Sequence, residues 1–253
     1  MILYFSGCGN SQYIAEELAR LTHDEMQPIL DLDVDRPVTL HDGVLGVVCP
    51  IYAWAVPRVV EEKLQKITFA TKPEYCYLAC TCGDSLGRAP ERWNHSLRRM
   101  GLHLDAAFGF VMPETYINLK GFRLDSPDSE ARKLAVVKER LPLVAEQIKA
   151  RRRVIDVRRG PVPRLTTYLV NPIFYQWIIT DKKFHASDCC IGCGKCAQVC
   201  PLHNIALVDG RPQWNGHCTN CMACYHHCPT NAIHFGKATQ GKGQYYFGHN
   251  QVE

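Results

Sequence analysis

Several features that define other classes of protein are missing from this sequence. No run of about 20 apolar residues is present, the length that a membrane-spanning helix needs. The most apolar stretch, residues 165–179, is shorter and contains Thr, Asn, Pro and Gln. It predicts packing between two domains or, as the alternative, an interfacial helix. No basic and apolar presequence precedes residues 1–5, so we expect no signal peptide and a cytoplasmic protein.

A disulfide framework is also missing, although the chain of 253 residues has 14 cysteines. Six of them show no framework spacing: Cys8, Cys49, Cys76, Cys80, Cys82 and Cys189. Charged residues are only 21% of the chain and the formal net charge is +4. These features predict a reducing compartment and give no support for a nucleic-acid partner.

The other eight cysteines form two runs with the spacing C-x2-C-x2-C-x3-C-P, which holds [4Fe–4S] clusters in bacterial ferredoxins. The runs are Cys190, Cys193, Cys196 and Cys200 before Pro201, and Cys218, Cys221, Cys224 and Cys228 before Pro229. In two-cluster ferredoxins the fourth cysteine of each run ligates the other cluster. We therefore predict one cluster on Cys190, Cys193, Cys196 and Cys228, and one on Cys218, Cys221, Cys224 and Cys200.

Zinc is the alternative for paired C-x2-C units. Each run already supplies four thiols followed by Cys-Pro, and the duplicated array favours iron–sulfur clusters. His217, His226 and His227 flank the second run, but the thiol ligands are already complete, so we interpret them as neighbours of the cluster. Electron transfer is the predicted function of this region.

The first 150 residues alternate β-like runs with amphipathic stretches, which predicts an α/β fold with a parallel sheet covered on both faces. Strands are expected at 1–5, 27–32, 44–49, 75–80 and 106–112, and helices at 11–21, 57–67, 85–100 and 129–152. Pro142 is expected to kink or split the last helix. Two short strands, 205–207 and 232–234, are expected after the cysteine runs.

The loop after the first strand is rich in small residues and leads into a helix. Backbone N–H groups and the helix dipole make such a loop an anion site. It lacks the lysine of a P-loop. The loops at 50–54 and 81–87 follow two further strands. They are therefore expected at the same edge of the sheet, where open α/β folds bind ligands.

The run Ser6-Gly7-Cys8-Gly9-Asn10-Ser11 resembles the FMN phosphate loop of flavodoxins, with Cys8 in place of the usual threonine. The whole chain, including residues 112–117 and 241–246, resembles the EFR1-type flavodoxin–ferredoxin fusion family of anaerobes. This resemblance implies a flavodoxin-like doubly wound parallel sheet of order 2-1-3-4-5, followed by a small α+β domain for two [4Fe–4S] clusters. It also implies FMN as a cofactor.

On this basis we expect FMN to contact three loops and a tyrosine. Tyr52 or Trp54 is expected to cover one face of the ring, and Tyr116 the other, unless that face is open toward the second domain. We predict that the flavin edge faces a cluster. The predicted contacts are Ser6, Gly7, Cys8, Gly9, Asn10, Ser11, Pro50, Ile51, Tyr52, Ala53, Trp54, Thr81, Cys82, Gly83, Asp84, Gly87 and Tyr116.

The predicted domains are 1–150 for the flavodoxin-like part, 151–185 for a basic and then apolar linker, 186–236 for the ferredoxin part and 237–253 for a tail. Basic residues gather around the first boundary: Lys149, Arg151, Arg152, Arg153, Arg158, Arg159 and Arg164. We interpret them first as a solvated helix end. A docking patch for an acidic redox partner is the second interpretation, and RNA binding the third.

The sequence therefore predicts an electron carrier that passes electrons between FMN, two clusters and a protein partner whose identity stays open. Two alternatives remain. One is a flavin-dependent reductase of a small substrate or of a protein-bound cofactor, with Asp84, Glu114 and Tyr116 as candidate groups. The other is a redox or oxygen sensor that responds to cluster loss. No separate nicotinamide motif is present.

Overall fold

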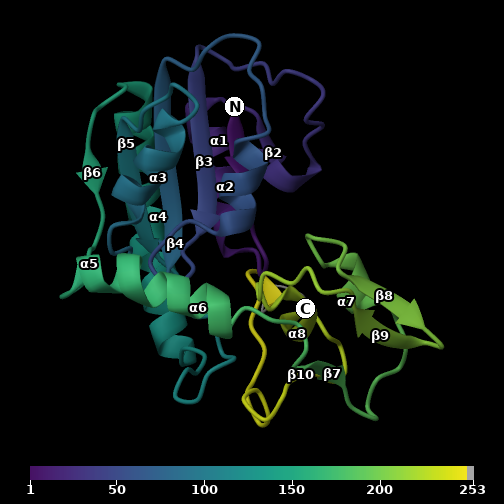
Figure 1. Cartoon of the computed structure of the whole chain (residues 1–253). Coiled ribbons are helices and arrows are strands. Elements are labelled where there is room, and N and C mark those ends of the chain that lie inside the picture. Colours follow the sequence, from purple (N-terminus) through teal and green to yellow (C-terminus); the bar gives the residue numbers. More distant parts are fainter. Residues whose placement is uncertain (250–253) are drawn as a thin grey trace.

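The computed structural model describes residues 1–249, so the end of the predicted tail, residues 250–253, lies outside the described part (Figure 1). The first domain contains a parallel sheet in the order β2-β1-β3-β4-β5-β6. This confirms the predicted flavodoxin-like order 2-1-3-4-5 and adds one edge strand from the linker. The strands are β1 (Ile2–Tyr4), β2 (Met26–Pro28), β3 (Val44–Pro50), β4 (Tyr75–Cys82), β5 (Ala106–Val111) and β6 (Ile155–Asp156).

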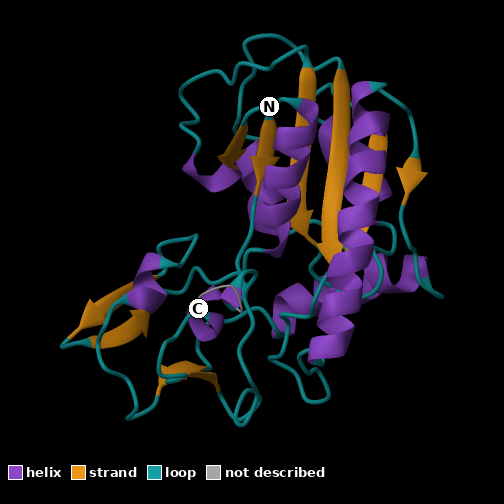
Figure 2. Ribbon diagram, turned by 180° about the vertical axis from the view of Figure 1, so that it is seen from behind, coloured by secondary structure: helices purple, strands orange, loops and turns teal. Residues whose placement is uncertain are grey.

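Helices cover both faces of this sheet, as the alternating pattern predicts. On one face α1 (Asn10–Thr22) and α4 (Pro127–Lys149) pack side by side, and Figure 2 shows this face toward the viewer. On the other face lie α2 (Arg58–Leu64) and α3 (Ala89–Arg98). The central strands β3, β4 and β5 are mostly apolar, because each contributes side chains to two buried layers.

Several element boundaries differ from the sequence-based expectation. The predicted strand 27–32 is wrong beyond Pro28, where the chain turns into the 3₁₀ helix η1 (Ile29–Asp31). The edge strand β2 pairs only with β1, and proline cannot donate to a sheet. Helix α3 starts four residues late, because Gly87 has a positive φ of 57° and Pro90 sits in the first helical turn. Pro142 lies within an uninterrupted α4.

The second domain is small and consists of two antiparallel ribbons and two short helices. Strand β7 (Phe184–Ala186) pairs with β10 (Ile233–Phe235), and β8 (Ile205–Val208) pairs with β9 (Arg211–Trp214). Each cysteine run contains one short helix, α7 (Lys195–Gln198) or α8 (Ala223–His226). The two short strands expected after the runs are therefore present, each within one residue of its predicted bounds.

A helical segment crosses the carboxyl edge of the sheet between the two domains (Figure 1). It comprises α5 (Pro163–Leu165), a π-helical turn η2 (Thr166–Val170) and α6 (Asn171–Trp177), and we call residues 163–177 the edge helix. After the second domain, the chain returns to the first. There Phe247 stacks on Tyr13 of α1 with 4.2 Å between ring centroids.

Candidate functional site

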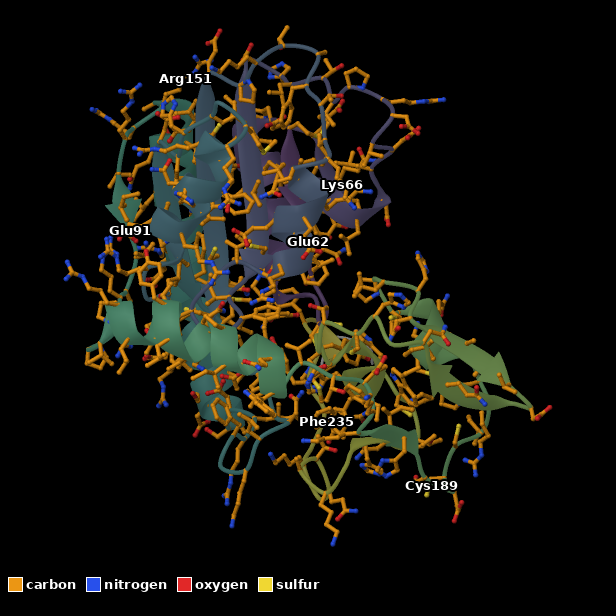
Figure 3. The ribbon with its side chains drawn as sticks, in the orientation of Figure 1. Glu62, Lys66, Glu91, Arg151, Cys189 and Phe235 are labelled. Atoms are coloured by element: carbon orange, nitrogen blue, oxygen red, sulfur yellow. The ribbon has the colours of Figure 1, made fainter. Side chains whose placement is uncertain are left out.

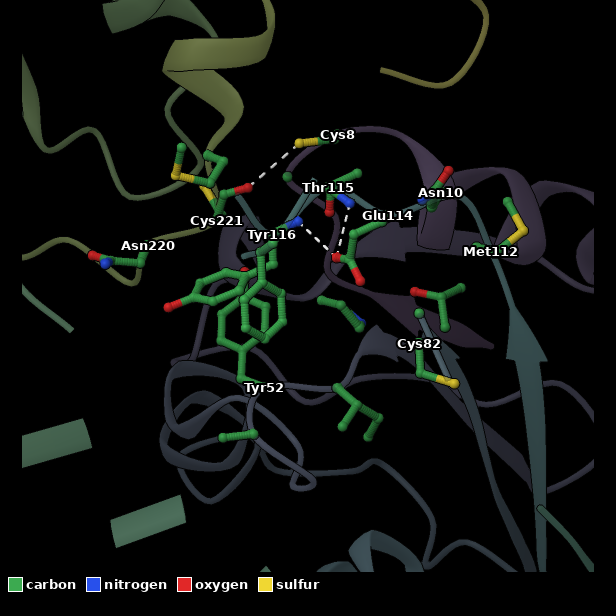
Figure 4. A pocket seen from close by; sticks show the side chains of 18 of the residues that line it. Cys8, Asn10, Tyr52, Cys82, Met112, Glu114, Thr115, Tyr116, Asn220 and Cys221 are labelled. Atoms are coloured by element: carbon green, nitrogen blue, oxygen red, sulfur yellow. Dashed lines mark hydrogen bonds between the residues drawn. The ribbon is translucent and has the colours of Figure 1, made fainter. Parts of the chain in front are cut away.

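A cavity of about 470 Å³ lies at the carboxyl edge of the sheet (Figure 4), within the size range typical of cofactor sites. Loops after β1, β3, β4 and β5 form most of its wall. Fifteen of the predicted FMN contacts line it: Ser6, Gly7, Cys8, Asn10, Ser11, Pro50, Ile51, Tyr52, Ala53, Trp54, Thr81, Cys82, Gly83, Asp84 and Tyr116. Gly9 and Gly87 do not line it, because Gly9, the N-cap of α1, faces Phe247 and Gly87 faces Trp54 and Thr167.

The loop after β1 presents hydroxyl groups at the start of α1. Gly9 N–H donates to Ser6 Oγ at 3.1 Å, and the hydroxyls of Ser11 and Thr81 lie 2.7 Å apart. Asn10 and Ser11 form the first turn of a 13-residue helix, whose free N–H groups and dipole favour an anion. This end of the cavity therefore suits a phosphate group.

Cys8 is a buried thiol in this loop. Its Sγ donates to the backbone oxygen of Cys221 at 3.4 Å (Figure 4), and burial raises the pKa of the thiol well above its usual value. A buried neutral thiol is a poor redox group, so we interpret Cys8 as a small side chain that packs at the domain contact. The residue that replaces threonine thus contacts the second domain.

The loop after β3 contains a strained two-residue turn at the cavity wall. Ala53 and Trp54 have φ angles of 45° and 62°, and Tyr52 and Ala55 exchange both backbone hydrogen bonds across them, at 2.9 and 3.2 Å. Such turns normally contain asparagine and glycine, because left-handed backbone is strained for other residues. Strain of this kind gathers at functional sites when surrounding contacts maintain it.

The edge helix provides those contacts through two fully buried polar residues. Asn171 donates from Nδ2 to the backbone oxygens of Tyr52 and Ala53, at 2.9 and 3.1 Å. Thr167 Oγ1 donates to the oxygen of Trp54 at 3.1 Å. The polar side of the edge helix therefore holds the strained turn in place.

We expect Asn171→Ala to destabilise the protein by about 1–3 kcal/mol, because the Ala53 carbonyl loses its donor and the Arg92 guanidinium loses an acceptor. Denaturant unfolding of the apoprotein measures this change, and Gln176→Ala on the exposed side of the same helix is the matched control. Equal effects of the two substitutions would contradict the holding role.

Two further groups bring polar chemistry into the cavity. Glu114 accepts from the N–H groups of Thr115 and Tyr116 through one oxygen, at 3.0 and 2.7 Å, and its other oxygen lies against Gly83 (Figure 4). Burial raises the pKa of this carboxyl group. Tyr116 also lines the cavity, and its hydroxyl is buried without a hydrogen-bond partner in the described structure.

The two cysteine runs have matching backbone geometry. Left-handed residues occur at equivalent positions, Gly192 and Gly194 in the first run and Asn220 and Met222 in the second. The fourth thiol of each run accepts a backbone N–H four residues later: Asn204 N donates to Cys200 Sγ at 3.3 Å, and Ala232 N to Cys228 Sγ at 3.2 Å. The two runs therefore share their backbone conformation and their hydrogen bonds as well as the spacing of their cysteines.

Neighbouring thiols follow an interleaved pattern. Cys200, from the first run, is an electrostatic neighbour of Cys218, Cys221 and Cys224. Cys196 has Cys190 and Cys228 as neighbours. Among residues 1–249, no three His, Cys, Asp or Glu side chains close around a point as the ligands of a single metal ion do. A cubane is larger than one ion, so its thiolates lie farther apart.

The second cysteine run forms part of the cavity wall. Asn220, Cys221 and Met222 line the cavity, and a Cβ atom on Gly7 would lie 2.7 Å from Cys221 Cβ. Met222 keeps a left-handed backbone although it is buried and bulky. The first cysteine run contributes no residue to this wall.

Sequence reasoning missed the part of the wall that comes from distant segments. The edge helix contributes Val170, Ile173 and Phe174, and the loop after β5 contributes Leu119 and Phe122. The apolar run at 165–179 was the available signal, but its expected role as packing between domains is wrong for most of its large side chains. Those that remain exposed are Leu165, Tyr168, Leu169, Val170, Ile173 and Trp177.

The basic run at the first domain boundary is largely ion-paired with the first domain. Lys149 pairs with Glu146, Arg151 with Glu74, Arg153 with Asp105, Arg158 with Asp84 and Arg159 with Glu91. Exposed pairs of this kind contribute little stability each. Their carboxylate partners favour the structural interpretation of this run over a docking patch.

No helix in residues 1–249 has the length and apolar content that crossing a membrane requires. A flavodoxin-like sheet with an edge cavity, joined to a domain with two matched cysteine runs, defines the class of iron–sulfur electron-transfer proteins. The family model of the 4Fe-4S dicluster domain matches residues 189–233. An uncharacterized ferredoxin from Methanocaldococcus jannaschii is 40% identical over 64 residues, which cover 22% of this chain and 73% of the relative. Through this domain, the chain belongs to the 4Fe–4S dicluster ferredoxin family.

A solved structure of a presumed flavoprotein from Bacteroides uniformis resembles a portion of the chain. It covers 44% of this chain and 88% of its own, with 16% identity and a TM-score of 0.34. A likeness at this level defines neither the fold nor a cofactor, and the flavodoxin-like assignment depends on the strand order alone.

Proposed function

We propose that the chain binds one FMN in the edge cavity and two [4Fe–4S] clusters in the second domain, and that electrons pass between them within the chain. The observation that carries this proposal is the shared wall. Asn220, Cys221 and Met222 belong to a cysteine run and also line the cavity. A ring bound there would have one cluster as its immediate neighbour.

The residues present fit FMN at both ends. Ser6, Ser11 and Thr81 offer hydroxyls beside the start of α1 for the phosphate. Tyr52 and Tyr116 line the cavity with aromatic side chains that suit an isoalloxazine ring. When bound, a flavin exchanges electrons singly or in pairs, while a cluster exchanges one. The protein residues supply position, burial and hydrogen bonds.

The interleaved neighbours support the ligand sets predicted from the spacing. Cys218, Cys221, Cys224 and Cys200 would hold the cluster beside the cavity, and Cys190, Cys193, Cys196 and Cys228 the outer cluster. Cys193 and Ile191 are exposed, and Cys189 lies at the outer surface of the second domain (Figure 3). The outer cluster is therefore the proposed point of exchange with an external protein redox partner.

Anaerobic analysis of the purified chain tests the cofactors directly. We expect about eight irons and one FMN per chain, given four irons per cluster. Photoreduction followed at flavin and cluster wavelengths then tests the transfer. Independent reduction of the two chromophores, with no exchange between them, would count against it.

A reductase function is the second candidate, and Glu114 is the observation that favours it. Its free oxygen faces the cavity beside Gly83, and its raised pKa would let it retain a proton nearer neutral pH than an ordinary glutamate does. A small substrate that reoxidises the reduced protein would identify this activity.

The proposal of an electron carrier also includes a cytoplasmic location and membership of the EFR1-type fusion group of anaerobes.

A further inference from the structure

The edge helix has its polarity reversed relative to a normal surface helix. Its fully buried positions are polar, Thr167 and Asn171. Between Arg164 and Trp177, every exposed position except Gln176 is apolar or aromatic. Leu169 is 55% exposed, Tyr168 51% and Trp177 70%. A surface helix ordinarily buries its apolar side against the core.

The exposed apolar side chains of the edge helix are not needed to attach this helix to the rest of the chain. The polar side already attaches the helix, through Asn171 and Thr167 to the turn at Tyr52–Trp54, and through the Tyr175 hydroxyl that accepts from the N–H of Arg58 at 3.0 Å. The exposed side chains touch solvent in the described chain. Contiguous exposed apolar surface of this kind marks an interaction site.

The same face continues onto the loop after β5. Phe122 is exposed, and its ring lies 5.5 Å from that of Tyr116, which in turn lies 5.8 Å from Phe174 of the edge helix. Phe122 and Ile173 line the same cavity mouth. The apolar face therefore comprises the outer side of the edge helix and the tip of this loop, and we call it the edge face.

Basic residues flank the segments of the edge face in the sequence. Arg164 precedes its apolar positions, Lys182 and Lys183 follow the helix, and Lys120 and Arg123 flank Phe122. Lys183 Nζ lies 5.6 Å from the ring centroid of Phe235 in the second domain, so the other four residues give the face its basic character. All five are exposed, and none takes part in an ion pair within residues 1–249. No acidic residue occurs between positions 157 and 180.

The basic residues indicate which partner could cover the edge face: a second copy of the chain or an anionic lipid surface. A second copy of the chain would bring one basic rim against another, and like charges across an interface are unfavourable. A convex helix with outward Leu, Ile, Tyr and Trp side chains and basic flanks matches an amphipathic helix lying in an anionic lipid surface. Tyrosine and tryptophan favour the boundary between headgroups and acyl chains.

We propose that the edge face binds the surface of an anionic membrane, with the edge helix lying in the headgroup region and no segment crossing the bilayer. This binding is independent of the proposed redox function. It would hold the mouth of the cavity, at Ile173 and Phe122, against the lipid surface.

Co-sedimentation of the anaerobically purified full chain with lipid vesicles tests the proposal. Vesicles of phosphatidylcholine alone are compared with vesicles containing phosphatidylserine, at low and at physiological salt. We expect binding only with the anionic lipid, weakened by salt. Arg164→Ala and Lys182→Ala should each lower the affinity about fivefold.

The apolar contribution is tested with Leu169→Asn combined with Trp177→Asn, which should lose at least about tenfold in affinity. Val136→Asn combined with Leu143→Asn is the matched control, since these exposed apolar residues lie on α4, outside the edge face. Circular dichroism and iron content verify that all variants are folded and loaded.

Three results would overturn the proposal: no binding to either vesicle, equal loss in the control pair, or an edge-face-dependent increase in mass without lipid, which would identify a second copy as the occupant. Because sedimentation measures the chain itself, a failure here leaves the cofactor analysis unaffected. If the chain retains no FMN but still binds vesicles, the membrane proposal stands and the cofactor proposal fails.

Discussion

Cys200→Ala is expected to abolish electron exchange between the flavin and the clusters, although Cys200 belongs to the run farther from the cavity. Its thiol is the neighbour of Cys218, Cys221 and Cys224, so the interleaved arrangement makes it the fourth ligand of the cluster beside the cavity. Iron should fall from about eight to about four per chain. Photoreduction should then leave the remaining cluster oxidised after the flavin is reduced.

Cys228→Ala is the matched variant, because it removes the corresponding thiol of the second run. It should also leave about four irons, but as the cluster that adjoins the cavity, so that flavin-to-cluster transfer persists. Exchange with an external partner should be lost instead, since the outer cluster is missing. If the two variants behave in the opposite way, each run ligates its own cluster and the interleaved assignment is wrong.

Gly7→Ala is expected to separate the phosphate loop from the second domain and to destabilise the chain by about 1–3 kcal/mol, the usual range for overpacking. An added Cβ would lie 2.7 Å from Cys221 Cβ and 2.8 Å from its backbone oxygen, and backbone atoms cannot move aside easily. FMN affinity should fall as well, because Gly7 and Cys221 both line the cavity. Denaturant unfolding and flavin titration measure the two effects.

Gly243→Ala is the control for this substitution. Its Cβ would meet only Leu124 Cδ1 at 3.4 Å, an ordinary contact, and neither glycine has a positive φ. The comparison therefore isolates crowding at the domain contact from the general effect of replacing glycine. A Gly7→Ala protein as stable as Gly243→Ala, with unchanged flavin affinity, would show that the contact is not tight.

Local residue patterns determined much of this protein without any tertiary information. Continuous apolar runs such as Val44–Cys49 and Tyr75–Cys80 are typical of strands buried on both faces, and their alternation with amphipathic stretches predicted the parallel sheet. The cysteine spacing predicted the ferredoxin domain that the family match confirms. The small residues from Ser6 to Ser11 predicted a loop that opens a helix, and the structure places it at the cavity.

What the tertiary structure decided depends on contacts between segments far apart in the chain. Local pattern could not place Cys221 against Gly7, nor turn the apolar side of residues 163–177 outward, because both depend on which partner covers which surface. The left-handed Ala53 and Trp54 likewise follow no local preference, and hydrogen bonds from the edge helix maintain them. The spacing of the cysteines predicts the cluster ligands, and the pattern of apolar residues predicts helices and strands. The joining of the two domains at one cavity depends instead on which surfaces the folded chain buries against each other.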